Sequence, residues 1–351
     1  MSRIEFSNPE GIKIVTTIDG KASVIPHLEP LVDENWKFTG FIGVYSKSGI
    51  VSKECRQFMK KYRSTFKYIF LSSFGPYFNS RYKSLYRKYD AVTSLDCELV
   101  HGKHIFPNNL ELNYPMWTRC APLSDGFFFK QKDNIAPDER FDFSILTWYG
   151  DRKAKVWPDA RRVMIGLCEK GYKGIVVIQR GSREAVLKDI NIKKYVDNGL
   201  LEVYNAEFDE ISFFNVMRRA WIGIFPNQLD ALPKHLIECY LTDKPAVISS
   251  KLLFGVESLR KLGETVTLVH DFSSPDIVDA IASFIDKTRE RTVESKSIIS
   301  PREAYLARYD LEHLSQIWAE EINRVFHTNY KRIYFMRHSN RYKEITSSWK
   351  I

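Results

Sequence analysis

Apolar runs of strand length alternate with helix-length segments through the second half of the chain. The apolar runs lie at Phe143–Tyr149, Gly174–Ile178, Leu200–Tyr204, Trp221–Phe225, Ala246–Ser249 and Val266–Val269. Helix-like patterns lie at Pro158–Glu169, Ser182–Tyr195, Asp209–Arg219, Leu232–Leu241 and Pro275–Ile285. Strands that alternate with helices of about 10–15 residues are typical of βαβ units and a parallel sheet. The second half therefore predicts a Rossmann-like domain, with helices on both faces of a mainly parallel sheet.

The first half has a weaker pattern. Strand-like runs lie at Ile12–Thr17, Phe41–Tyr45, Tyr68–Ser72 and Ala91–Ser94. The basic segments Lys53–Arg63 and Ser80–Tyr89 have the character of helices between these strands, which favours a second α/β layer. An irregular region rich in Pro, Asn and Gly, residues 107–126, followed by a polar segment, indicates the connection between domains.

These patterns divide the chain into three parts. We predict an N-terminal Rossmann-like domain over residues 1–132 and a C-terminal Rossmann-like domain over residues 133–326. The second domain ends with an amphipathic helix, Pro301–Phe326, and a basic tail follows at residues 327–351. The predicted fold class is α/β.

Composition places the chain among ordinary globular proteins. It has 351 residues, of which 44% are hydrophobic and 27% charged. No run approaches the ~18 apolar residues of a membrane span. The five cysteines are odd in number and far apart, so neither a disulfide framework nor a structural zinc site is expected. The N-terminal residues lack the features of a secretory signal, and we expect a cytoplasmic protein or one bound peripherally to a membrane.

The excess positive charge is concentrated in two segments. Between Lys53 and Lys88 there are ten Lys or Arg residues and one acid, which equals the net charge of +9 for the whole chain. The segment Lys331–Lys350 has six basic residues and one acid. Both are rich in aromatic residues. Such charge attracts any polyanion, so three interpretations stay open: an anionic membrane surface, a nucleic acid such as DNA, or solvated helices without a ligand.

Several enzyme classes lack their motifs in this chain. The glycine-rich dinucleotide and phosphate-binding loops are absent, as are the Gly-x-Ser-x-Gly elbow and the His-Glu-x-x-His zinc motif. No two aspartates stand two positions apart, so an Asp-x-Asp metal clamp is also missing. His101 and His104 have no third ligand in view, and we interpret them as ordinary loop histidines. No metal site is expected.

The run from Ile224 to Ser249 carries the most information. A strand ends at Phe225, and a helix then opens with Asp230 as a plausible N-cap and Pro233 in its first turn. The free backbone N–H groups of this helix tip face the carboxyl ends of the strands, where parallel sheets bind ligands, and suit a diphosphate. The residues of the tip are Ala231, Leu232, Pro233 and Lys234.

Glu238 stands eight positions after Asp230, just over two helical turns on. It can therefore reach another part of a long ligand, and a carboxylate that accepts two hydroxyl hydrogen bonds is suited to a ribose or a hexose. In the alternative interpretation, Asp230 only caps the helix and Glu238 is solvated.

This run resembles the signature of retaining glycosyltransferase family 4. The family pattern is Glu-Gly-x-Pro-x-x-Leu-x-Glu-Ala, followed by a short turn and Pro-Val-Val/Ile-Ala/Ser, and this chain has Asp230 to Glu238 followed by Lys244 to Ser249. Asp230 replaces the first glutamate and is one methylene shorter, whereas Glu238 matches the second. The resemblance covers roughly residues 120–326.

The resemblance implies a GT-B glycosyltransferase, in which two Rossmann-like domains face each other across a cleft and the last helix returns to the first domain. It implies that the first domain binds the acceptor and the second the sugar nucleotide, with the basic tail packed back on the first domain. It also implies that Asp230 contacts the donor sugar, that the helix tip holds the diphosphate and that Glu238 holds the ribose. Transfer would be retaining and metal-independent. The donor would be a nucleoside-diphosphate sugar such as a UDP- or GDP-sugar, and no further cofactor is implied.

The family also has an Arg and a Lys after the first strand of this domain, and these two residues bind phosphate. The candidates here are Arg152, Lys153 and Lys155. The separation between Arg152 and Lys155 is shorter than the five positions usual in the family. In the alternative interpretation they form a solvated basic turn.

The expected function is hexosyl or pentosyl transfer to a saccharide, a lipid-linked glycan or a modified nucleic acid. A non-catalytic GT-B-like binding protein and a sugar-nucleotide epimerase of the same architecture remain alternatives.

Overall fold

The chain folds into two compact units in a computed structural model. The model describes residues 3–7, 13–18, 21–25, 28–45, 51–71, 88–93, 109–110, 140–147, 149, 157–178, 181–205, 218–228, 234–252, 256–294, 300–335 and 349–350. The first unit consists of residues 1–122 and 310–351, and the second of residues 123–309. The sequence patterns instead predict boundaries after residues 132 and 326. The observed boundary lies before residue 310, not after 326, because the last long helix packs on strands of the first unit.

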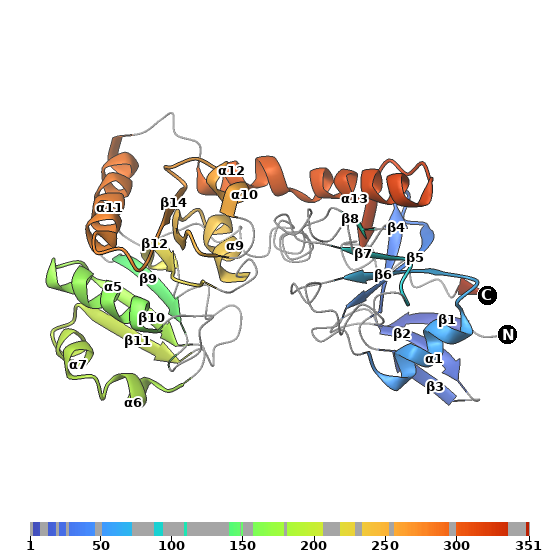
Figure 1. Cartoon of the computed structure of the whole chain (residues 1–351), viewed down its shortest axis with the longest axis horizontal. Coiled ribbons are helices and arrows are strands. Elements are labelled where there is room, and N and C mark those ends of the chain that lie inside the picture. The colour runs from blue at the N-terminus through green and yellow to red at the C-terminus, as the bar shows by residue number, and fades with distance from the viewer. Residues whose placement is uncertain are drawn as a thin grey trace. The chain divides into compact units, whose positions relative to one another are not determined.

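The described strands of the second unit form a six-stranded sheet in which every neighbouring pair is parallel (Figure 1). In chain order the strands are β9 (Phe141–Thr147), β10 (Gly174–Ile178), β11 (Leu201–Asn205), β12 (Ala220–Phe225), β13 (Ala246–Ser249) and β14 (Thr267–His270). Their spatial order, β11-β10-β9-β12-β13-β14, corresponds to the order 3-2-1-4-5-6 of a doubly wound Rossmann fold. All six strands predicted from the apolar runs are confirmed within one or two residues.

Helices follow most of these strands. They are α5 (Trp157–Glu169), α6 (Arg183–Val186), α7 (Ile190–Asp197), α9 (Lys234–Leu241), α10 (Val256–Arg260), α11 (Ile277–Glu294) and α12 (Pro301–Tyr309). The single helix predicted at Ser182–Tyr195 is two helices, because Asp189 adopts an extended conformation and caps α7 by accepting a hydrogen bond from Asn191 N at 3.1 Å. Most of the helix predicted at Asp209–Arg219 lies outside the described residues.

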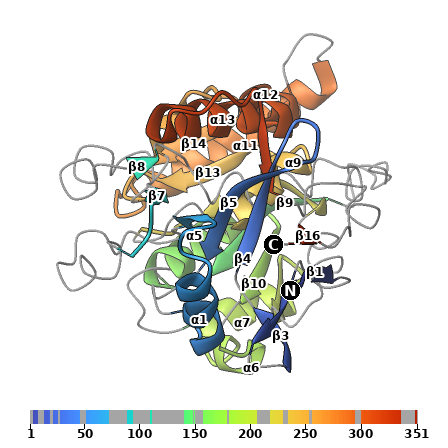
Figure 2. The same ribbon diagram turned by 90° about the vertical axis from the view of Figure 1, so that its right-hand side faces the viewer.

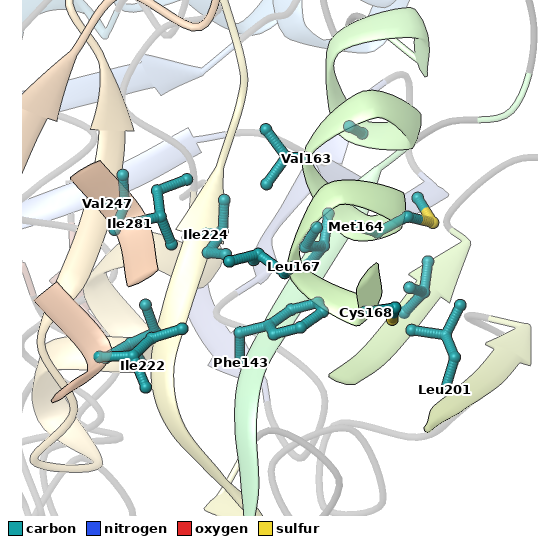
Figure 3. Close-up of a cluster of buried hydrophobic side chains, with 14 of the residues drawn as sticks. Phe143, Val163, Met164, Leu167, Cys168, Leu201, Ile222, Ile224, Val247 and Ile281 are labelled. Carbon is teal, nitrogen blue, oxygen red and sulfur yellow. The ribbon is translucent and has the colours of Figure 1, made fainter. Parts of the chain in front are cut away.

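The core of the second unit lies between the sheet and helices α5, α7 and α11. Figure 3 shows side chains of this core, among them Phe143, Leu167 and Ile281. Ile222 and Ile224 of β12 belong to this cluster. Successive side chains of a strand point to opposite faces, so Gly223 between them faces the other way, towards α9. Each such buried aliphatic side chain contributes roughly 1.5–3 kcal/mol.

The first unit contains a mixed six-stranded sheet among its described residues, in the order β15-β4-β5-β6-β7-β8. Strands β5 (Phe38–Tyr45), β6 (Lys67–Leu71), β7 (Ala91–Thr93) and β8 (Asn109–Leu110) are parallel. Strands β4 (Leu28–Asp33) and β15 (Ile333–Phe335) add an antiparallel edge. The predicted α/β layer is confirmed, but this edge was not predicted.

A second, smaller sheet of the first unit is antiparallel. Among the residues described there, it joins β1 (Arg3–Ser7), β2 (Lys13–Ile18), β3 (Lys21–Ile25) and β16 (Trp349–Lys350). The strand predicted at Ile12–Thr17 is β2 and lies in this sheet, not in the parallel layer. Most of the helix predicted at Ser80–Tyr89 lies outside the described residues.

Helix α1 (Lys53–Lys61) follows β5 and packs on this unit's larger sheet (Figure 2). Its N-cap is Ser52, whose hydroxyl accepts a hydrogen bond from Cys55 N at 3.2 Å. Cys55 and Phe58 are buried in the core, whereas Lys53 and other basic side chains of the helix are exposed. The basic character of this segment therefore belongs to the outer face of an amphipathic helix.

The predicted C-terminal helix is also two helices. Asp310 ends α12 and caps α13 (Leu311–Phe326) by accepting a hydrogen bond from His313 N at 2.6 Å. In α13, Trp318 packs edge-on against Phe335 of β15 with ring centroids 5.3 Å apart, and Phe326 lies against Phe41 of β5 at 4.8 Å. The return of the last helix to the first unit is confirmed. Within the described ranges, none of the helices combines the length and the hydropathy that crossing a bilayer requires.

Candidate functional site

The order of the parallel strands places a ligand-binding edge between β9 and β12. These two strands are neighbours, with Ile145 opposite Ile224, and their chain connections leave in opposite directions, to β10 through α5 and to β13 through α9. Doubly wound sheets bind ligands at such a switch point, outside the carboxyl ends of the strands. Because α5 and α9 each follow one of these strands, both helices begin at this edge, and their N-terminal N–H groups favour an anion there.

Helix α9 is held firmly against the sheet by its apolar face. Leu236, Ile237 and Tyr240 are fully buried. The Tyr240 hydroxyl lies 2.7 Å from Thr267 Oγ1, and its ring stacks on Tyr305 of α12 with centroids 5.6 Å apart. These contacts determine the rotation of α9 about its own axis.

Close packing against β12 fixes the distance of α9 from the sheet. A methyl group in place of the Gly223 hydrogen would lie 2.6 Å from Cys239 Sγ. Only a glycine at this strand position lets the helix approach so closely.

Glu238 is buried on this helix, with 4% of its surface exposed. Its Oε2 lies 2.6 Å from Nδ1 of His235, one turn earlier on α9. Buried carboxylates require hydrogen bonds, and with Glu238 ionised this bond runs from the Nδ1–H group of His235 to Oε2. The alternative in which Glu238 is a solvated surface residue is therefore wrong. Its contact with a ribose stays a prediction.

Of the other predicted site residues, Lys234 lies among the described residues. Lys234 is the first residue of α9. The remaining candidates lie outside the described residues: Arg152, Lys153, Lys155, Asp230, Ala231, Leu232 and Pro233. Their roles stay predictions.

A polar network that the motif analysis missed lies at the carboxyl ends of the strands. Gln228, just after β12, donates a hydrogen bond from Nε2 to Oδ2 of Asp159 in the first turn of α5, at 2.9 Å. Burial raises the pKa of this carboxyl, against the opposing effects of Arg162 and Lys251. Arg162 donates to the carbonyls of Phe272 and, at 3.0 Å, Ser274 after β14.

A second part of this network joins the segments after β13 and β14. Lys251 Nζ lies 2.9 Å from Oδ1 of Asp271 and 2.7 Å from the Ser273 hydroxyl. Hydrogen bonds from Ser273 and Lys251 hold the pKa of Asp271 well below its usual range. The sequence signal for Gln228, Lys251, Asp271 and Ser273 was their position two to four residues after a predicted strand. Their side-chain contacts connect the segments that follow the strands, at the edge where a ligand would bind.

No group of three or more His, Cys, Asp or Glu residues in the described part of the chain is placed to hold a metal ion. What this edge offers instead is positive electrostatic potential from helix N-termini and a buried, oriented carboxylate. Such an arrangement suits an elongated ligand with an anionic centre and hydroxyl groups.

Comparison with known proteins identifies the fold. No protein-family profile matches the chain, and no curated protein matches it by sequence. The solved structure of TarM has a TM-score of 0.54 at 10% identity, over 92% of this chain and 75% of that one. A mutant of S. aureus TarM, in complex with fondaparinux, alpha-GlcNAc-glycerol and UDP, has the same TM-score at 12% identity, over 92% and 76%. The N-terminal domain of Candida albicans trehalose-6-phosphate phosphatase has a TM-score of 0.51 at 9% identity, over 81% and 70%.

At these identities the likeness concerns the fold alone. The chain has the GT-B fold of glycosyltransferases, with two Rossmann-like domains, as expected. Membership of family 4 stays a prediction.

Proposed function

We propose that this protein is a glycosyltransferase that moves a sugar from a nucleoside-diphosphate sugar to an acceptor. The observation that carries the proposal is the buried Glu238 on α9, the helix that begins beside the switch point of a Rossmann-like sheet. Glu238 lies four residues, just over one helical turn, after Lys234, the first residue of α9, so the helix N-terminus and this carboxylate suit the diphosphate and the ribose of such a donor. The GT-B fold supports the same class.

The chemistry that we propose for this site follows from its charges. The helix tip, with Lys234 and the cations Arg152, Lys153 and Lys155, would neutralise the leaving nucleoside diphosphate. Asp230 would hold hydroxyls of the transferred sugar, and Glu238 those of the ribose. We propose that transfer proceeds with retention and needs neither a metal nor a further cofactor. Exclusion of water would protect the donor from hydrolysis.

UDP is the first donor nucleotide to test, because the S. aureus TarM mutant was solved with UDP. GDP is the second. For the acceptor, the exposed basic face of α1 favours an anionic or anion-linked molecule over a neutral one, because charge of one sign attracts its opposite.

A thermal-shift screen of UDP-, GDP-, ADP- and TDP-sugars tests donor binding. A ligand at 100 times its dissociation constant stabilises the native state by about 2.7 kcal/mol. The donor that stabilises the protein is then incubated with it, and release of the nucleoside diphosphate is measured with and without candidate acceptors. A protein that binds a donor but never releases the diphosphate would be a binding protein, and a product with an altered sugar still on the nucleotide would indicate an epimerase.

The matched variants are Glu238→Ala, Asp230→Ala and the control Glu257→Ala. Glu257 is an exposed glutamate of α10 in the same unit. We expect the first two variants to lose most of the transfer activity and the control to retain it. Wild-type turnover in both Glu238→Ala and Asp230→Ala would refute the site.

A further inference from the structure

His235 and Glu238 form a pair on one face of α9. They stand three positions apart, which brings side chains together on a helix. Nδ1 of His235 lies 2.6 Å from Oε2 of Glu238, and the two side chains are 18% and 5% exposed. The bond is thus short and mostly shielded from water, and hydrogen bonds are stronger in such surroundings than in water.

The backbone of α9 cannot by itself set the plane of the Glu238 carboxylate. Rotation about the last side-chain bond of a glutamate is broad, without the sharp preferences of an aliphatic bond. Two neighbouring hydroxyls of a sugar nevertheless require both carboxylate oxygens in a defined plane. A donor with a fixed position on the same rigid helix can supply this constraint, and His235 Nδ1 has that position.

We propose that His235 is a positioning residue for the donor site, which orients the Glu238 carboxylate towards the ribose hydroxyls. The inference rests on the proposed function, since it assigns His235 a role through Glu238. His235 itself need not touch the donor. Its bond to Oε2 lowers the orientational freedom that the carboxylate would otherwise lose when the nucleotide binds, so affinity is gained through preorganisation.

The test measures binding of free nucleoside diphosphates by calorimetry, without any transfer step. In metal sites, loss of a hydrogen bond that orients a ligating side chain typically costs about 10- to 100-fold in affinity, and by analogy we expect a loss of about 10-fold or more for His235→Ala. His235→Asn should restore most of the affinity, because Asn Nδ2 is two bonds beyond Cβ, as is His Nδ1. His235→Gln places its nitrogen one bond further and should restore little.

Two controls separate a positioning role from a structural one. In the Glu238→Ala background, His235→Ala should cause no additional loss, because the residue through which it acts is gone. His313→Ala, at an exposed histidine of α13, should bind like the wild type. Urea unfolding of each variant establishes that the fold is intact, and the near-isosteric His235→Asn keeps the test decisive if His235→Ala unfolds.

The outcomes distinguish this inference from the proposed function. If the wild type binds none of UDP, GDP, ADP and TDP, both fail. If the wild type binds and Glu238→Ala binds measurably more weakly, but His235→Ala binds normally, only the positioning role is overturned. It is also overturned if His235→Asn binds nucleoside diphosphates as weakly as His235→Ala does. The same holds if His235→Ala weakens binding by the same factor in the Glu238→Ala background as in the wild type.

Discussion

The contact between Gly223 and Cys239 determines how closely α9 approaches β12, and Gly223→Ala tests it. The new methyl carbon would lie 2.6 Å from Cys239 Sγ and 2.8 Å from Cε2 of Phe225. Non-bonded carbon atoms prefer separations of about 3.5–4.0 Å. The overlap of about 1 Å must be relieved by movement of the helix or of the Phe225 ring.

Two opposing effects set the size of the expected change. Overpacking of a core typically costs about 1–3 kcal/mol. Replacing glycine by alanine also restricts the unfolded chain, which returns about 0.4–1 kcal/mol where the backbone accepts it. The net expectation for Gly223→Ala is a loss of about 1–2 kcal/mol in the free energy of unfolding, or roughly 2–8 °C in Tm for a domain of this size.

Urea unfolding, followed by circular dichroism, measures this loss, and a double-mutant cycle identifies its cause. Cys239→Ala removes Sγ and leaves space for the new methyl group. The double variant should therefore be more stable than the sum of the single losses by about 1 kcal/mol or more. If the two losses are simply additive, the methyl group does not meet Cys239 and the packing described for α9 is incorrect.

Two further predictions concern a buried ion pair and three buried thiols. Asp142 is buried, accepts a hydrogen bond from Lys173 N at 2.7 Å and pairs with Arg289 of α11. Arg289→Met should therefore lower the free energy of unfolding, measured in urea, by about 3 kcal/mol. This value is near the low end for breaking a buried ion pair because Arg289 is partly exposed. Adding Asp142→Asn should recover most of it, and a cost below about 1 kcal/mol for Arg289→Met alone would contradict the ion pair. Burial raises the pKa of the thiols of Cys55, Cys168 and Cys239 to about 12. At pH 8 a thiol reagent should therefore label these cysteines only after unfolding, which peptide mass spectrometry can establish. Rapid labelling of the native protein would show that they are accessible.

The parallel strands of the second unit were predictable because they are buried on both faces. β10 and β13, for example, are short apolar runs rich in β-branched residues, and both have the predicted bounds. The helices that cross between strands were also predictable, except where a local cap interrupted the pattern. Asp189 and Asp310 each cap a helix that begins within a few residues of the end of the previous one, and their capping character can be recognised in the sequence only when the break is already suspected.

The antiparallel edge of the first unit could not be predicted from local pattern. β15 pairs with β4 through Ile333 opposite Asp33, three hundred positions apart in the chain. Each of these strands is short, and nothing within either segment identifies its partner. Pairing over such a separation depends on the return of α13, which brings the end of the chain to the first unit.

For the candidate site, the amino-acid sequence alone determined the spacing of Asp230 and Glu238 and the strand–loop–helix order around them. Spacing is a property of the local chain, so it could be read without a structure. Tertiary structure decided that Glu238 is buried, and that Gln228 meets Asp159 while Lys251 meets Asp271. Burial and pairing depend on which faces and strand ends the sheet order brings together, and that order follows from the packing of the whole unit rather than from any one segment.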